Sequence, residues 1–542
     1  MSKEAAEMDT TSASNSNTPS FPATLRGREF YKSIGSPKFI VAPMVDRSEF
    51  AWRMLTRSFM TKEESHRLLA YSPMFHARLF KETEAFRVQH FQPTRRDNDA
   101  GKPFLDGNPA FDRPLFVQFC ANNPDDFVEA AHQVAPYCDA VDLNLGCPQG
   151  IARKGHYGAF LQEDWDLIYK LINRLHTELP IPVTAKFRIQ ETKEKTLQYA
   201  KMILSAGANI ITVHGRTREQ KGHNTGVADW SYIRYLRDNL PPETVIFANG
   251  NILNYGDIEH CLEATGADGV MSAEGNLSDP TIFGQTPAVG SEGREYWRGR
   301  NGKGGYRMDA VLRRYLNIIH EYVLEQPVPE RKPLFLPSDE ATTATIEQNK
   351  LSESTSSESP QDGAVNGKRK AENNYNDHND KETEPPTKKQ KHAKGKRVAE
   401  PNLVAMQGHL FQLLRPLVAQ KTHIRDTLAR TRSGDIASFE RILSMVEEAV
   451  KEGITEYERN PSHFDSQQQD ADKLQGSKAT IAEYGRPWWV CQPYIRPLPE
   501  EAIALGAMKV SKKDQRKAEA ATNASANAID EKIESAASAV SA

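Results

Sequence analysis

Cysteine is scarce in this chain, and its spacing excludes two common kinds of structural staple. Five cysteines occur among 542 residues, an odd number, and no two of them are separated by only two residues. This pattern argues against a disulfide framework and against a structural zinc site. It is typical of a chain from a reducing, intracellular compartment.

Long apolar runs and an excess of charge are lacking as well. No apolar run approaches the ~18 residues of a transmembrane helix, and residues 1–20 lack the apolar core of a secretory signal. We therefore expect no membrane partner. The formal net charge is -3, so contact with nucleic acid must come from local basic patches. No Gly-x-Gly-x-x-Gly fingerprint of a dinucleotide site follows the first apolar run.

Short apolar runs do recur between residues 37 and 284, with amphipathic stretches between most of them. Near-continuous apolar strands that alternate with helices indicate a parallel sheet covered by helices. Eight such units favour a (β/α)8 TIM barrel, an α/β fold, although an open eight-stranded sheet would give the same pattern. The runs are 39–44, 69–75, 115–120, 140–146, 183–188, 210–215, 245–250 and 269–275.

Local signals set several boundaries within this pattern. Asn123 before Pro124 predicts a helix N-cap followed by a first-turn proline. Residues 165–175 carry apolar side chains at helical spacing, and Gly207 predicts the end of another helix. The polar stretch 81–113, between the second and third runs, predicts an inserted surface loop.

The rest of the chain predicts an all-α region with a disordered insertion. Amphipathic periodicity marks 306–324, 404–420 and 439–452, whereas 336–400 is rich in Ser, Asn, Glu, Lys and Pro. An aromatic segment follows at 485–499. The predicted units are a disordered tail (1–36), the barrel (37–290), a helical region (291–335 and 400–500), a disordered basic linker (336–399) and a second disordered tail (501–542).

Polar side chains gather where the predicted strands end, which is the edge at which barrel enzymes carry their function. The last two strands are also where many barrels bind phosphate, through backbone N–H groups of glycine-containing turns. The candidate residues are Pro43, Met44, Gln118, Asn144, Cys147, Lys186, Arg188, His214, Asn249, Gly250, Asn251, Ala273, Glu274 and Gly275.

Seven segments in a fixed order give the chain a resemblance to a known family. They are VAPMVDRSEFAWR, VQFCANNPDDFVEAA, DLNLGCPQG, AKFRI, VHGRTREQKG, FANGNI and GADGVMSAEG. In this order they resemble the tRNA-dihydrouridine synthases, most of all the eukaryotic branch that acts on positions 16 and 17 of the D-loop. The resemblance covers residues 37–284 well and the part beyond about 300 only loosely. It implies an FMN-dependent enzyme that reduces uridine in tRNA, with NADPH or NADH as the reductant.

The resemblance implies the chemistry of the site. Reduction of uracil needs a hydride at C6, which reduced flavin supplies, and a proton at C5. The resemblance assigns the proton to Cys147, because a thiol with an ordinary pKa near ~8.5 is protonated at neutral pH and can act as a general acid. Lys186 would contact the flavin ring, where a cation stabilises the anionic reduced form. The implied substrate-binding residues are Asn144 and Arg188 for the uracil, and Arg153 and Lys154 for RNA phosphate.

The resemblance also implies a lining for the cofactor. Gln118 and His214 would hydrogen-bond the flavin edge and the ribityl-phosphate side. One departure concerns the eighth strand: many relatives outside this branch continue it with Gly-Arg-Gly, where this chain has Ala273-Glu274-Gly275. Since a carboxylate does not bind phosphate, the anion would rest on backbone N–H groups and His214. The implied cofactor residues are Pro43, Met44, Val45, Gln118, Lys186, His214, Asn249, Gly250, Asn251, Ala273 and Glu274.

Two basic clusters lie in the predicted linker, at 368–370 and 387–397. They indicate nuclear import, which we favour, or an electrostatic RNA tether; we expect the protein in nucleus and cytoplasm. Trp488 and Trp489 stand beside prolines, where tryptophans more often anchor a segment on a core than stack on bases. We expect a monomer whose partner is tRNA, with mRNA left open as a second substrate.

Two other functions stay open. A small-molecule flavin oxidoreductase, similar to dihydroorotate dehydrogenases, would use the same barrel, and a decayed barrel would serve as a non-enzymatic RNA-binding protein. A helical extension is superfluous in the first case, and intact Cys147 and Lys186 argue against the second.

A chain ended near residue 290 is expected to keep its cofactor and lose tRNA affinity. The extension carries cations spaced to form a basic face: Arg313, Arg314, Arg415, Lys421, Arg425, Arg430 and Arg432.

Overall fold

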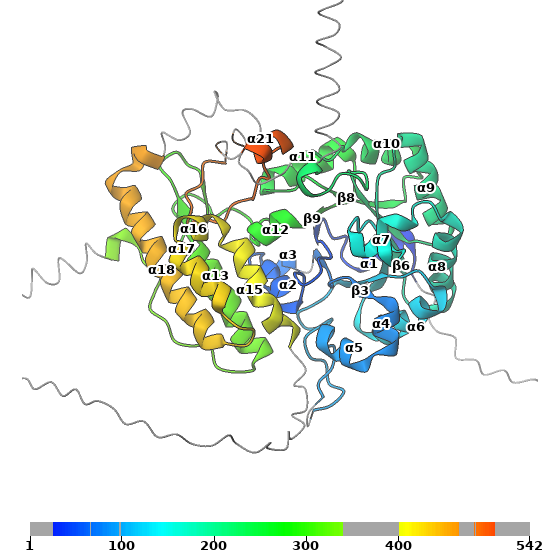
Figure 1. The fold of residues 1–542 in the computed structure, drawn as a ribbon, viewed down its shortest axis with the longest axis horizontal. Coiled ribbons are helices and arrows are strands. Elements are labelled where there is room, and N and C mark those ends of the chain that lie inside the picture. Colours follow the sequence, from blue (N-terminus) through cyan, green and yellow to red (C-terminus); the bar gives the residue numbers. More distant parts are fainter. Residues whose placement is uncertain are drawn as a thin grey trace, which may run out of the picture.

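The computed structural model describes residues 25–339 apart from 66, 97 and 98, then 400–464, 478, 482 and 484–504. The basic clusters of the linker lie outside these residues. The predicted barrel forms, and Figure 1 shows it beside a separate helical unit. Its strands are β1 (Phe39–Val41), β2 (Leu68–Tyr71), β3 (Phe75–His76), β4 (Leu115–Cys120), β5 (Ala140–Leu145), β6 (Val183–Arg188), β7 (Ile210–His214), β8 (Val245–Asn249) and β9 (Gly269–Ser272).

The sheet closes on itself, which makes it a barrel and not an open sheet. Its order is β2-β1-β9-β8-β7-β6-β5-β4-β3, and β4 is also hydrogen-bonded back to β2, where Ala70 pairs with Leu115. The short β3 continues the second strand along the same neighbour. The predicted strand 69–75 is therefore split around Pro73, because proline lacks the N–H that a strand ladder needs.

The local signals for helices are confirmed. The Asn123 side chain accepts N–H groups from Asp125 at 2.8 Å and Asp126 at 3.0 Å, which caps α6. Gly207, with φ of 110°, follows the end of α9. The outer helices are α6 (Pro124–Val134), α8 (Trp165–Glu178), α9 (Lys193–Ser205), α10 (Ser231–Asn239) and α11 (Tyr255–Thr265), with the shorter α7 (Gly150–Lys154) and α12 (Glu274–Ser278).

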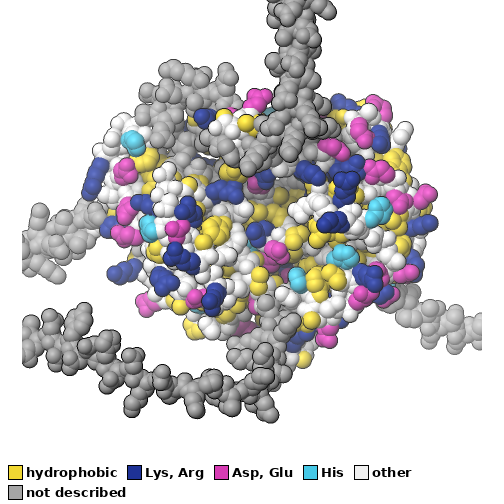
Figure 2. All heavy atoms as spheres, viewed as in Figure 1, with side chains coloured by type: hydrophobic (Ala, Val, Ile, Leu, Met, Phe, Trp, Pro, Cys, Tyr) yellow, Lys and Arg dark blue, Asp and Glu magenta, His cyan; other side chains and the backbone are white. Residues whose placement is uncertain are grey.

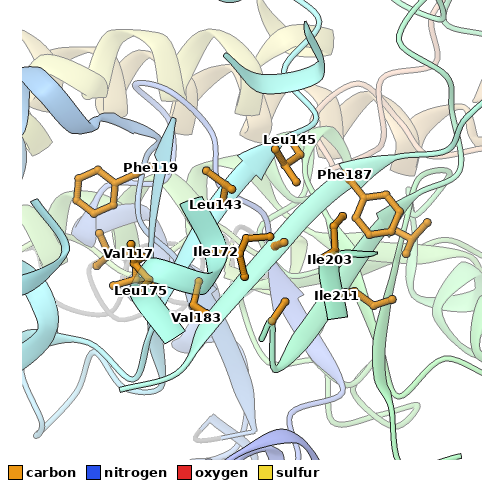
Figure 3. Packing of buried hydrophobic residues seen from close by; sticks show 14 of the residues in the cluster. Val117, Phe119, Leu143, Leu145, Ile172, Leu175, Val183, Phe187, Ile203 and Ile211 are labelled. Atoms are coloured by element: carbon orange, nitrogen blue, oxygen red, sulfur yellow. The ribbon is translucent and has the colours of Figure 1, made fainter. Parts of the chain in front are cut away.

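Strand residues alternate between the outer helices and the barrel interior. Figure 3 shows the outward set: Val117, Leu143 and Val183 lie in one apolar cluster with Ile172 and Leu175 of α8. Their strand neighbours face inward, and they include the predicted site residues Gln118, Asn144, Lys186 and Arg188 together with Asp142 and Thr184, which were not predicted.

Helix α1 (Gly27–Ser33) closes the amino-terminal end of the barrel. Its Phe30 and Tyr31 are buried, and the Phe30 ring stacks on Phe116 with ring centroids 5.9 Å apart. The Tyr31 hydroxyl group reaches the carbonyls of Pro37 and Asp268, just before β1 and β9. The expected tail of residues 1–36 is therefore wrong for its last part, because these aromatic side chains fill the bottom of the barrel.

The insertion after β3 is more than the predicted surface loop. It forms α4 (Ala77–Glu82) and α5 (Glu84–His90), and then brings Asp106 and Asp112 into the interior. Both carboxylates bind the guanidinium of Arg53 in α2 (Phe50–Arg57), with Nη2 at 2.8 Å from Asp106 and Nε at 3.0 Å from Asp112. The prediction is wrong here because a polar composition also suits a buried ion-pair network.

A second apolar core joins the barrel to the helical unit. Trp52 and Leu55 of α2 lie in one buried cluster with Leu316, Met406 and Phe439 of the unit, and Figure 1 shows α2 and α12 between the two parts. A chain ended near residue 290 would expose this surface, so the unit stabilises the barrel. The predicted helices are confirmed as α13 (Met308–Ile318) with a π-helical turn (Ile319–Val323), α15 (Pro401–Leu413), α16 (Arg415–Gln420) and α18 (Ile436–Arg459). A further helix, α17 (Thr422–Arg430), was not predicted.

The segment 484–504 crosses from the helical unit to the barrel. Val490 pairs with Arg307 in an antiparallel bridge, and Trp489 is fully buried, which confirms that it anchors the segment. Arg486 forms an ion pair with Asp279 at 3.1 Å. The second tail begins later than predicted, because 499–504 form α21 (Pro499–Ala504). Among the helices in the described ranges, none has the length and apolarity to cross a membrane.

Candidate active site

The carboxyl ends of the strands bring the predicted residues to one mouth of the barrel. Asn144 and Lys186 are neighbours in the β5–β6 register, Arg188 and His214 in the β6–β7 register, and His214 and Asn249 in the β7–β8 register. In Figure 2 the middle of the molecular face is hollowed, with hydrophobic side chains on its floor and Lys and Arg around it. The strand ends thus bring amide, ammonium, guanidinium and imidazole side chains together at one mouth.

Cys147 stands on a tightly held loop just beyond β5. Its N–H donates to Asn144 Oδ1 at 2.9 Å, and its carbonyl accepts the N–H of Ala159 at 3.1 Å. Opposite it, Gly158 has φ of 65°, and a Cβ there would lie 2.9 Å from the Cys147 carbonyl oxygen, so only glycine fits. The Cys147 thiol is half-buried, whereas the other four cysteines are buried. Burial raises the pKa of the neighbouring Cys120 to about 12, which leaves Cys147 as the thiol placed to meet a reactant.

Lys186 is a half-buried cation at the same mouth. Its Nζ donates to Asn249 Oδ1 at 2.9 Å, and the Asn249 Nδ2 donates to the Met271 carbonyl at 3.0 Å. Burial lowers the pKa of Lys186 to about 8, helped by Arg188 and opposed by Asp142. The ammonium group thus stays mostly protonated at neutral pH, and a bound anion would stabilise it further.

Arg188 fastens two loops of the mouth to each other. Its Nε donates to the Gly146 carbonyl at 2.9 Å, and its Nη1 donates to the carbonyls of Thr217 at 2.9 Å and Gln220 at 3.2 Å. Burial lowers the pKa of Arg188 to about 10, and the charge of Arg216 acts in the same direction. The guanidinium therefore holds the Cys147 loop, while its contact with uracil stays a prediction.

His214, Arg216 and Asn251 form a cationic corner near Lys186. Arg216 Nη1 lies 3.2 Å from His214 Nε2, and its Nη2 donates to Asn251 Oδ1 at 2.7 Å. Because a guanidinium group only donates, Nε2 must accept and Nδ1 carries the imidazole proton. Burial holds the pKa of His214 well below its ordinary value, and the surrounding cations Lys186, Arg188 and Arg216 lower it further.

The turn after β8 holds this corner rigidly. Gly250 has φ of 113°, and a Cβ there would lie 2.6 Å from the Ala228 Cβ and 3.1 Å from His214 Cδ2. Asn251 is also left-handed, with φ of 62°, and its Oδ1 accepts the Ala228 N–H at 3.0 Å. Glycine at 250 is therefore needed for the close approach of the turn to His214.

Arg496 reaches the corner from the C-terminal segment. Its Nη2 lies 3.0 Å from Glu274 Oε1, and its Nε lies 3.2 Å from both carboxylate oxygens. Glu274 thus holds a cation near the place where the Gly-Arg-Gly pattern would set one, and Arg216 supplies another. Neither Arg216 nor Arg496 is among the predicted cofactor residues, and Arg496 has no local signal because its partner lies 222 positions away.

The first and last strands contribute the remaining predicted cofactor residues. Pro43 and Met44 are half-buried directly after β1, and the Met44 N–H donates to Ser48 Oγ at 3.0 Å. Val45, one residue further, is 52% exposed. Ala273 precedes the first turn of α12. Their contacts with a cofactor stay predictions.

Gln118 lies inside the barrel, whereas the predicted RNA-binding cations lie on its surface. Gln118 is fully buried, and its amide is engaged on both sides, by Asp142 and by Asn144. Arg153 and Lys154 are exposed on α7, a few residues beyond Cys147. The exposed pair is placed to meet a large substrate, whereas Gln118 acts from beneath the mouth.

The helical unit is less cationic than its sequence predicts. Arg313 pairs with Glu447, and Lys421 pairs with Glu452 at 2.6 Å. These partners lie far along the chain, so the sequence pattern did not reveal the neutralisation. Three other members of the predicted basic face are engaged as well, namely Arg314 with Glu295, Arg415 with the ring of Tyr494 and Arg425 with Asp426.

A closed barrel with a half-buried thiol, a half-buried lysine and a cationic corner at one mouth defines a barrel enzyme. The profile of the Dihydrouridine synthase (Dus) family matches residues 40–329. The chain is 42% identical over 475 residues to the Schizosaccharomyces pombe tRNA-dihydrouridine(16/17) synthase, covering 88% of this chain and 92% of that protein. It is 38% identical over 502 residues to the Saccharomyces cerevisiae protein of the same name, covering 91% and 93%. A Mus musculus relative is 46% identical over 276 residues, 50% of this chain and 53% of its own length. The chain therefore belongs to the dihydrouridine synthase family.

Proposed function

We propose that this protein reduces uridine to 5,6-dihydrouridine at positions 16 and 17 of the tRNA D-loop, with FMN as bound cofactor and NADPH or NADH as reductant. One observation carries the proposal: Lys186 and Cys147, both half-buried, share the barrel mouth. The Lys186 ammonium group suits an anionic cofactor, and the Cys147 thiol suits the role of a proton donor. The names of the two yeast relatives, tRNA-dihydrouridine(16/17) synthase, support the substrate, the positions and the nicotinamide.

The residues at the mouth fit FMN. Burial lowers the pKa of Lys186, so this cation gains stability from an anionic partner. The corner of Arg216, His214 and the rigid turn at Gly250 suits a phosphate group, since a guanidinium presents several N–H donors. When bound, FMN supplies the hydride chemistry.

The side chains of this chain supply the rest of the reaction. Cys147 donates the proton to C5 of the uracil, and the thiol sulfur keeps the negative charge until it is reprotonated from solvent. Arg188 keeps the Cys147 loop in place through the Gly146 carbonyl. Arg153 and Lys154 bind RNA phosphate at the rim. A target uridine must leave the folded tRNA to reach this depth, which costs about a few kcal/mol.

The purified protein is expected to be yellow and to release FMN on denaturation. The Arg216→Leu variant should weaken FMN binding about tenfold or more, because a charge-assisted contact to the phosphate is lost. The matched control is Arg174→Leu on the outer helix α8, which should bind FMN normally. Chromatography of the released flavin and a fluorescence titration of the apoprotein measure both. A released flavin that carries an adenylate would contradict this assignment.

A further inference from the structure

A buried hydrogen-bonded cluster spans three neighbouring strands inside the barrel. In the sheet register Asp142 lies between Gln118 on β4 and Thr184 on β6. All three side chains are buried. Asp142 Oδ1 accepts from the Thr184 hydroxyl group at 2.6 Å, and its Oδ2 accepts from Gln118 Nε2 at 2.8 Å. Each oxygen of the carboxylate thus accepts one hydrogen bond.

The cluster continues upward to the loop that bears Cys147. Gln118 Oε1 accepts from Asn144 Nδ2 at 2.8 Å. Asn144 Oδ1 then accepts the backbone N–H groups of Gly146 at 3.1 Å and Cys147 at 2.9 Å. An unbroken chain of hydrogen bonds therefore runs from Asp142 to the backbone of Cys147.

The direction of this chain is set at its buried end. An ionised carboxylate only accepts, so Gln118 must turn its NH2 group toward Asp142 and its oxygen toward Asn144. Asn144 must then direct its NH2 group toward Gln118 and its oxygen toward the N–H groups of Gly146 and Cys147, which need an acceptor. The reverse orientation would set the Asn144 NH2 group against the Cys147 N–H, donor against donor.

We propose that Asp142 is a positioning residue for Cys147: its carboxylate fixes the orientation of the Gln118 and Asn144 amides and thereby anchors the Cys147 loop. The proposal rests on the proposed function in taking Cys147 as the proton donor. Burial raises the pKa of Asp142 to about 6, against the hydrogen bonds of Gln118 and Thr184 and the charge of Lys186. The carboxylate is therefore mostly ionised at neutral pH, as the chain of hydrogen bonds requires.

A pair of nearly isosteric substitutions separates this role from mere packing. In Asp142→Asn, the new carbonyl can still face Gln118 while its NH2 group donates to the Thr184 hydroxyl oxygen, so the direction survives. In Thr184→Val, the carboxylate remains and the direction survives as well. In the double variant the NH2 group of the new amide at position 142 loses the Thr184 acceptor, which favours donation to Gln118 Oε1, and Gln118 and then Asn144 turn over with it.

The readout is the rate at which iodoacetamide alkylates Cys147 in the native protein, since the other four cysteines are buried. Either single variant should label within about threefold of the wild type. The double variant should label about tenfold faster or more, because the two hydrogen bonds that hold the loop are lost together. Its dihydrouridine yield per turnover should fall by a similar factor while FMN stays bound.

Additive labelling effects, with the rate change of the double variant equal to the product of the two single changes, would overturn the proposal, since a purely structural cluster predicts additivity. Asp142→Asn with Thr184→Ser restores an acceptor and should label like the wild type. Should the double variant not fold, Gln118→Met cuts the same chain one link higher and should label faster too; an unchanged rate there also overturns the proposal. The labelling needs neither tRNA nor nicotinamide, so its failure is distinct from a failure of the proposed function.

Discussion

Cys147→Ala is expected to lower dihydrouridine formation on tRNA by ~10²–10⁴-fold, the usual contribution of a positioned general acid. Cofactor binding and reduction by NADPH should be unaffected. The loop is held through the N–H of residue 147, which donates to Asn144, and through its carbonyl, which accepts from Ala159, and alanine keeps both groups. The measurement is single-turnover product by mass spectrometry, beside the rate of NADPH oxidation without tRNA.

Two further variants control this result. Cys147→Ser should recover little activity, because a hydroxyl group is a far weaker acid than a thiol. Cys261→Ala removes a thiol buried in α11, away from the mouth, and should keep full activity. A near-normal dihydrouridine yield from Cys147→Ala would remove this residue from the mechanism.

Arg53→Met is expected to lower the free energy of unfolding by ~3–5 kcal/mol, the cost of leaving buried carboxylates without their partner. Arg53 and Asp112 are fully buried, and Asp106 is 4% exposed. Burial lowers the pKa of Arg53, but Asp112 and Asp106 more than offset this and raise it above its ordinary value. The guanidinium ties α2 to the insertion after β3, so its loss separates two elements. Urea unfolding followed by fluorescence gives the change in stability.

The controls for this prediction test charge and exposure separately. Arg53→Met combined with Asp112→Asn should recover part of the loss, because one unpaired buried charge is removed. Arg78→Met breaks an exposed ion pair with Glu82 on α4 and should leave the urea midpoint unchanged. A midpoint for Arg53→Met close to that of Arg78→Met would show that the network contributes little to stability.

The barrel could be predicted because its signals are local. Each strand is a short apolar run, and Asn123 with Pro124 starts α6 as a first turn should. The ends of the predicted strands also placed Asn144, Lys186 and Arg188 at the edge where barrel enzymes carry their function. Such features depend on a few adjacent residues, so the sequence alone predicts them.

The structure differs from the predictions where partners lie far apart in the sequence. Phe30 and Tyr31 look like part of a polar tail until the barrel end that they fill is known. Arg496 and Glu274 come together across 222 positions, and Arg313 meets Glu447 across 134. No local pattern predicts such contacts, because the fold alone creates them.

Asp142 shows the same limit inside a well-predicted strand. It sits in the run 140–146 between apolar residues, and its position alone does not tell which donors it meets. Only the register that aligns it with Gln118 and Thr184 makes it the buried end of the chain of hydrogen bonds to Cys147.

The most direct test of the central claim uses purified protein, NADPH and tRNA transcribed without modifications. Dihydrouridine is mapped by mass spectrometry of nuclease fragments, with free uridine as a parallel substrate. The account predicts dihydrouridine at positions 16 and 17 of the tRNA and none from free uridine. Reduction of the free base or nucleoside with unmodified tRNA left intact would contradict it, and would point to a small-molecule reductase on the same barrel.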